Sequence, residues 1–184
     1  RKNIDGSGRW RVVIRYVALP LIFLFLFIME SVFLFFVPSY GQINDYMIVP
    51  HFLFISFVFS AMYYQRNTTL IYAFIFGAIF DIFYTSLLGV YAYLFPLTVY
   101  LVCKVMQPLY KKLAIIFVFT LTGIIFIEFL VFGIQSAVGK SSIGIEEFMY
   151  NRLWPTLVIN IVFLLLFSYG LKKIFVKFYK IEDK

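Results

Sequence analysis

The chain has 184 residues, of which 63% are hydrophobic, 22% aromatic and only 14% charged, with a mean hydropathy of +0.95. A soluble domain of this length needs more polar surface than this to cover its core, so composition excludes a soluble protein. The net charge is +7, but the basic residues stand at the ends of apolar runs. They form no patch interleaved with aromatic residues, which argues against nucleic-acid binding. The single cysteine, Cys103, excludes a disulfide within the chain.

The apolar runs predict one all-α integral membrane domain, residues 13–184, folded as a compact bundle of about six transmembrane helices. A helix needs roughly 20 residues to cross a bilayer. Residues 1–12 are predicted to be a polar N-terminal extension, whose Gly6-Ser7-Gly8 is typical of a linker or expression scar. In chain order, the predicted spans are about Val17–Val37, Tyr46–Tyr64, Thr68–Tyr84, Val90–Met106, Leu113–Val138 and Leu153–Leu171. Polar or turn-forming residues separate them, the longest such stretch being Gly139–Arg152.

The connection at Ser86–Gly89 is so short and apolar that five spans remain an alternative, and the basic residues help to decide. With six spans and the amino terminus inside, all but two of the 16 Lys and Arg residues fall on the inner side, the exceptions being Lys140 and Arg152. Cytoplasmic segments of membrane proteins carry this excess of positive charge. Five spans would place the lysine-rich tail outside, so we predict six spans with both termini in the cytoplasm.

Five polar side chains lie inside or beside the predicted spans at similar depth. At a rise of 1.5 Å per residue, Glu30, Asp81 and Glu128 lie about 20 Å from the inner ends of their helices. Asn160 lands at a similar height, and His51 lies slightly nearer the outer surface. Ionisable groups near the bilayer centre cost roughly 2.5–3.5 kcal/mol each on insertion scales, so they require a reason. We therefore predict one buried polar layer contributed by five helices.

Two interpretations of this layer stay open. The first is a proton or ion relay, or a small-molecule pocket. The second is a set of interhelical hydrogen bonds that fix helix contacts. We favour the second because transport usually requires broken helices or paired basic groups. Under it, Asp81 is expected to contact polar groups of the first, fifth or sixth span.

The sequence offers little for catalysis. His51 has no second His or Cys at metal-ligand spacing, so a metal site is not expected. Ser31, Ser56 and Ser60 lack a neighbouring base that would activate a nucleophile. A glycine-rich phosphate loop is missing. We therefore expect neither an enzyme nor a cofactor.

Small residues in the third and fifth spans suggest places where helices approach closely. Ala73 and Gly77 share one helix face with Asp81, because residues four apart lie above one another. Gly123 and Gly133 are further candidates. Small residues allow close packing of membrane helices, so these four either form a surface for a partner helix or pack within the bundle.

Several stretches, in this order, resemble the bacterial rod shape-determining protein MreD family. The run Ile71–Tyr91 is similar to the family's signature, a Gly-xxx-Asp motif followed by a short turn and a further Gly, here Gly77, Asp81 and Gly89. The other similar segments are Leu19-Pro20 and Glu30-Ser31 of the first span, Glu128–Ser136 with Gly133 and Gln135 of the fifth, and Arg152, Pro155, Thr156 and Asn160 around the start of the sixth.

The resemblance implies a non-enzymatic scaffold subunit of the cell-wall elongation (rod) complex, which maintains cell shape during peptidoglycan biosynthesis in the bacterial plasma membrane. Its implied partners are an MreC-like bitopic membrane protein, the actin-like MreB, RodA, a class B penicillin-binding protein and membrane lipid. The architecture is also similar to the substrate-binding subunits of energy-coupling-factor transporters, which gives the alternative of a solute- or lipid-binding subunit. The two differ in whether the polar residues line a void or close on one another.

Overall fold

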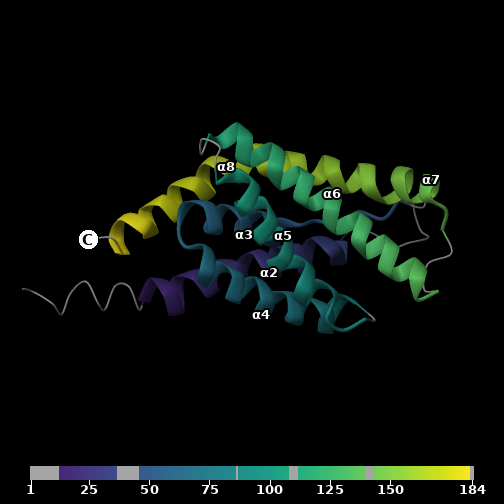
Figure 1. Ribbon diagram of the computed structural model, residues 1–184, viewed down its shortest axis with the longest axis horizontal. Coiled ribbons are helices and arrows are strands. Elements are labelled where there is room, and N and C mark those ends of the chain that lie inside the picture. Colours follow the sequence, from purple (N-terminus) through teal and green to yellow (C-terminus); the bar gives the residue numbers. More distant parts are fainter. Residues whose placement is uncertain (1–12, 37–45, 86, 108–111, 140–142, 183–184) are drawn as a thin grey trace, which may run out of the picture.

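The computed structural model describes residues 13–36, 46–85, 87–107, 112–139 and 143–182. The predicted extension 1–12, Lys140 and the turn residues Ser86 and Pro108 lie outside these ranges. Six helices run along the bundle and alternate in direction along the chain (Figure 1). They are α2 (Leu19–Phe36), α3 (Phe52–Tyr63), α4 (Arg66–Tyr84), α5 (Val90–Met106), α6 (Leu113–Ala137) and α8 (Trp154–Glu182). The described residues contain no strand, so the all-α prediction is confirmed for them.

Short elements precede two of these helices. The π-helical turn η1 (Ile14–Ala18) leads into α2, and α7 (Ile145–Phe148) with the π-helical turn η2 (Met149–Leu153) leads into α8. In Figure 1 the start of η1 and the end of α8 lie at the same end of the bundle. Helix α8 also runs well past the predicted limit at Leu171, because its lysine-rich tail continues the helix to Glu182. Lys has good intrinsic helix propensity, and nothing in that tail breaks the helix.

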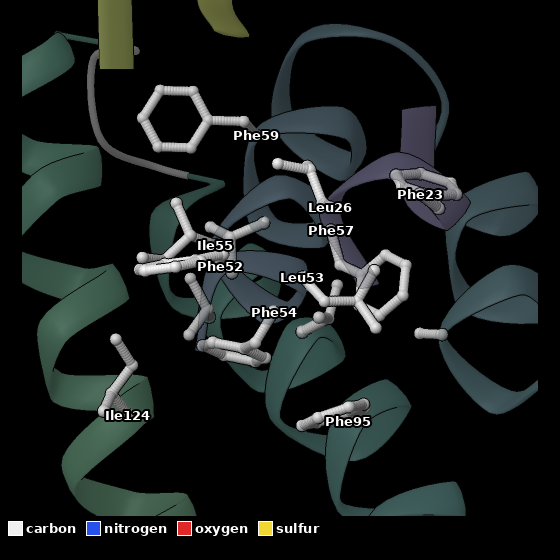
Figure 2. Close-up of a cluster of buried hydrophobic side chains, with 14 of the residues drawn as sticks. Phe23, Leu26, Phe52, Leu53, Phe54, Ile55, Phe57, Phe59, Phe95 and Ile124 are labelled. Atoms are coloured by element: carbon white, nitrogen blue, oxygen red, sulfur yellow. The ribbon is translucent and has the colours of Figure 1, made fainter. Parts of the chain in front are cut away.

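Helix α3 lies at the centre of the bundle and packs against α2, α4, α5, α6 and α8. Every residue from Phe52 to Ser60 is buried, which explains its apolar character on all sides. Aromatic rings fill the space around it (Figure 2): Phe57 lies 4.8 Å from Phe23 of α2, and Phe54 lies 6.0 Å from Phe95 of α5, between ring centroids. Helices α3 and α5 thus lie between α2 and α4 on one side of the bundle and α6 and α8 on the other (Figure 1).

Four helices are long and apolar enough to cross a membrane by themselves: Tyr16–Phe36, Arg66–Tyr84, Leu113–Ala137 and Ile145–Ile181. The two remaining apolar helices, α3 and α5, are shorter. At 1.5 Å per residue, the 12 residues of α3 span about 18 Å and the 17 residues of α5 about 25 Å, against a hydrocarbon core of about 30 Å.

The prediction of a continuous helix over Tyr46–Tyr64 is wrong in its first part. Residues 46–51 are not helical, and the helix starts only at Phe52. Pro50 contributes to this, since it lacks an N–H and disfavours helical geometry at Val49. An extended chain covers up to about 3.3–3.6 Å per residue, so residues 46–51 can add up to roughly 20 Å to the roughly 18 Å of α3. The segment as a whole is therefore long enough to cross a bilayer.

The third and fourth predicted spans are separate helices, α4 and α5, that pack against each other as an antiparallel pair. This removes the alternative of one continuous span through Ser86–Gly89. The predicted range Val90–Met106 is the observed range of α5. Gly89, which precedes α5, has a φ of +97°, a backbone conformation that residues with a Cβ rarely adopt. The chain can therefore reverse within five residues.

Candidate functional site

A buried ionic network joins α6, the segment 46–51 and the turn η2 that precedes α8. Oε1 of the Glu128 carboxylate, on α6, lies 2.8 Å from His51 Nε2. Oε2 of the same carboxylate accepts a hydrogen bond of 2.7 Å from Arg152 Nε. Glu128 and His51 are fully buried, and Arg152 is 9% exposed. A buried charge is tolerated when it is paired and hydrogen-bonded. Here one carboxylate uses each of its oxygens on a different basic side chain.

The same region satisfies the backbone of the non-helical segment 46–51. The Met47 N–H donates to the Asn151 carbonyl at 2.7 Å, and the Val49 N–H donates to Thr156 Oγ1 at 3.0 Å. Asn160 accepts from the His51 N–H at 2.8 Å and donates to the Val49 carbonyl at 3.1 Å. Irregular backbone at membrane depth is tolerated only where protein groups or a wet cavity satisfy it. Here the Asn151 carbonyl of η2 and the side chains of Thr156 and Asn160 of α8 satisfy it.

Glu30 reaches the same place from α2. Its Oε2 accepts a hydrogen bond of 3.0 Å from the Leu53 N–H, in the first turn of α3, and its side chain is fully buried. The first N–H groups of a helix have no acceptor within the helix, and a carboxylate beside them also interacts favourably with the helix dipole. Among the described residues, Glu30 Oε1 and His51 Nδ1 have no hydrogen-bond partner. Both atoms belong to residues that surround the start of α3.

Asp81 forms a second, separate site at the junction of α4 and α5. Its two carboxylate oxygens accept hydrogen bonds from the backbone N–H groups of Gly89, Tyr91 and Ala92 at 2.9–3.1 Å. The Thr85 hydroxyl donates a further bond of 3.1 Å. Asp81 therefore caps α5 at its amino-terminal end from the side of α4. The expectation that Asp81 contacts the first, fifth or sixth span is wrong, because the unsatisfied backbone N–H groups of the next helix are nearer.

The structure buries all five polar residues predicted from the sequence but divides them among these sites. His51, Glu128 and Asn160 belong to the ionic network, and Glu30 lies beside it at the start of α3. Asp81 serves the α4–α5 junction alone. Sequence reasoning placed Arg152 on the outer side and in an MreD-like segment but did not pair it with Glu128, and it gave Thr85 no role. The spacing of Asp81 and Thr85, four residues apart at the end of a helix, was the available signal.

The four small residues named from the sequence differ in whether they pack within the bundle or face outward. A Cβ on Gly77 would lie 2.5 Å from the Tyr91 carbonyl oxygen, so this glycine is what lets the backbones of α4 and α5 touch. Ala73, one turn earlier, is fully buried. A Cβ on Gly123 would lie 3.0 Å from Phe54 Cζ, inside the bundle. Gly133 has nothing within 4 Å of its Cβ position. Of the four candidates, only Gly133 offers an open helix surface.

The family model described as "rod shape-determining protein MreD" matches residues 10–179. The chain belongs to the MreD family. The rod shape-determining protein MreD of Bacillus subtilis (strain 168) is 33% identical over 143 residues, which cover 78% of this chain and 83% of that protein. No solved structure shows a significant match. The resemblance read from the sequence is thus confirmed, and the chain is a helical membrane protein of this shape-determining family.

The MreD-like signature in this chain has a physical explanation. Gly77 lets α5 approach α4, Asp81 binds the amides that begin α5, and Gly89 provides the reversal between them. Gly-xxx-Asp with a following Gly therefore describes one tight helical hairpin. The alternative of a solute-binding subunit receives no support from the comparisons. The described polar residues bond to one another and to backbone, and none of the five lines the cavity described below.

Proposed function

We propose that this protein is a non-enzymatic scaffold subunit of the rod complex that builds the lateral cell wall. In this proposal it crosses the bacterial plasma membrane six times and keeps both termini in the cytoplasm. Its direct partner is an MreC-like bitopic membrane protein, and it acts with MreB, RodA and a class B penicillin-binding protein. Family membership carries the proposal. The engagement of its buried ionisable groups in holding helix ends and irregular backbone supports it.

The exposed face of α6 is the docking surface that we propose for the single helix of the MreC-like partner. Its outward positions repeat at helical spacing, through Thr122, Phe126, Phe129, Gly133 and Ser136. Gly133 has no side chain and nothing lies within 4 Å of its Cβ position, so the α6 backbone is accessible there, one turn after Phe129. Lipid tails are as apolar as Leu, so membrane helices associate through close packing at small residues. A helix crossing at Gly133 can approach the α6 backbone there.

The outer segment that follows α6 extends this surface. Phe148 of α7 packs on α6 through Phe132, with ring centroids 4.3 Å apart, and through Phe129 at 5.5 Å. Ile145, Glu146 and Glu147 of α7 are exposed beside them. We propose that Gly139–Arg152 contacts the extracellular part of the MreC-like partner. Of this stretch, residues 140–142 lie outside the described chain.

Co-purification of the MreC-like partner with Gly133→Leu tests the docking surface. We expect the variant to retain the fold, since the Gly133 position is open, and to recover several-fold less partner than the unchanged protein. Gly170→Leu is the matched control, because Gly170 of α8 is equally open and lies off this surface. Gly123→Leu is unsuitable, since it collides with Phe54. If Gly133→Leu and Gly170→Leu bind the partner equally well, the partner docks elsewhere.

A further inference from the structure

A cavity of about 340 Å³ lies at the end of the bundle where α3 ends, α4 begins and α5 ends. Its lining residues are Ala61, Met62, Arg66, Cys103, Met106 and Gln107. This volume falls at the lower end of the range of small-molecule sites, about 300–1,000 Å³. Met62, Met106 and Ala61 give it apolar walls, whereas Arg66 and Gln107 give it hydrogen-bond donors. The cavity is therefore amphipathic, and it is separate from the polar sites described above.

Among the described residues of α3, α4 and α5, the charge near this cavity is positive and no acid lies at this end. The Arg66 guanidinium lies 4.9 Å from the centroid of the Tyr100 ring, and the Lys104 ammonium lies 6.0 Å from the same centroid. Helices α3 and α5 contain no acidic residue, and the only acid of α4 is Asp81, at its opposite end. No ion pair involving Arg66 occurs among the described residues. Stacking on Tyr100 engages the face of the guanidinium, and its N–H groups supply the donors for an anion.

The helix ends have opposing effects on an anion here. Arg66 is the first residue of α4, whose initial N–H groups and dipole favour negative charge. The last turn of α5 has the opposite polarity, and Lys104 lies in that turn and offsets it. With Arg66 added, the local balance favours an anion. The donor set, a guanidinium together with a nearby ammonium and an amide, suits the oxygens of a phosphate.

We propose that this cavity binds the phosphate of an anionic membrane phospholipid. The apolar walls suit the glycerol and the first methylene groups of a lipid better than they suit a free phosphate ion. Lys172 of α8, 5.6 Å from the Tyr63 ring, adds positive charge at the same end. Basic pockets between membrane helices recognise lipid headgroups in this way.

Native mass spectrometry of the purified full chain, titrated with phosphatidylglycerol or with zwitterionic phosphatidylcholine, tests the proposal. We expect one phosphatidylglycerol to bind per chain, about tenfold more tightly than phosphatidylcholine. Arg66→Gln should remove about tenfold of this affinity, whereas Arg66→Lys should retain most of it. Lys112→Gln is the matched control, since it removes one exposed positive charge that does not line the cavity.

A second variant and a competition experiment complete the test. Ala61→Leu narrows the cavity without changing its charge and should also weaken phosphatidylglycerol binding, so it decides the matter if Arg66→Gln fails to fold. Millimolar inorganic phosphate should not displace the lipid. Displacement by phosphate alone would identify a free anion as the ligand and overturn the assignment to lipid. Equal binding of the two lipids, or unchanged binding in both Arg66→Gln and Ala61→Leu, would overturn the site itself.

Discussion

The Asp81 cap allows a quantitative prediction of stability. Asp81→Leu removes the acceptor for three backbone N–H groups, of which those of Tyr91 and Ala92 belong to buried residues. A buried donor left without a partner costs about 1–3 kcal/mol, and the loss of a helix cap alone costs about 0.5–2 kcal/mol. The two buried donors together therefore predict a loss of about 2–6 kcal/mol. Asp81→Asn keeps one acceptor oxygen but loses the charge, so it should cost only about 1–2 kcal/mol.

Unfolding of the purified variants in mixed micelles measures these differences. Ile82→Leu provides a matched control, because Ile82 is 66% exposed on the neighbouring face of α4 and should change stability little. The order of stability should be unchanged protein and Ile82→Leu first, then Asp81→Asn, then Asp81→Leu. The reasoning is refuted if Asp81→Leu costs less than about 1 kcal/mol, or if Asn and Leu are equally damaging.

Three further predictions concern the bundle. Removing one partner of the Glu128–Arg152 pair, as in Glu128→Leu or Arg152→Leu, should cost about 3–5 kcal/mol of unfolding free energy. The double variant should lose clearly less than the sum of the two single losses, and additive losses would contradict the pairing. Gly77→Ala should destabilise the protein by about 1–3 kcal/mol, because the Cβ of the new alanine meets the Tyr91 carbonyl. Gly133→Ala should leave stability unchanged. Equal effects of the two substitutions in the same unfolding assay would be inconsistent with the α4–α5 contact. In a Cys103→Ala background, a cysteine at Tyr179 should resist membrane-impermeant thiol reagents on spheroplasts, whereas one at Ile145 should be labelled; the reverse pattern would exclude a cytoplasmic carboxyl terminus.

Much of the bundle could be predicted from the sequence because apolar length and charge placement follow directly from the bilayer. The range of α5 and the separation of α4 from α5 came from composition and turn residues alone. The irregular segment 46–51 could not be predicted in this way. Its residues are as apolar as those of a helix, and what stabilises it is a set of distant side chains, Thr156 and Asn160, more than 100 positions along the chain.

The polar residues show the same contrast. Their burial could be predicted from the sequence, whereas their hydrogen-bond partners could not. Their burial follows from the cost of placing charge in lipid, which the sequence reveals. Their partners depend on how helices pack, and the nearest unsatisfied groups were backbone amides for both Asp81 and Glu30. Gly77 and Gly123 likewise looked suited to a partner helix, yet both face neighbours within the bundle. A small residue indicates close approach without indicating which surface approaches.

The central claim, membership in a rod complex through direct contact with an MreC-like protein, is tested most directly by photo-crosslinking in native membranes. A photoreactive residue at Gly133 of the full chain should yield an adduct with the MreC-like protein, identified by mass spectrometry. The same residue at Gly170 should yield little or none. A complex that forms through α6 predicts this contrast. An MreC-like protein that is never captured at either position, and that does not co-purify with the chain, would contradict the account.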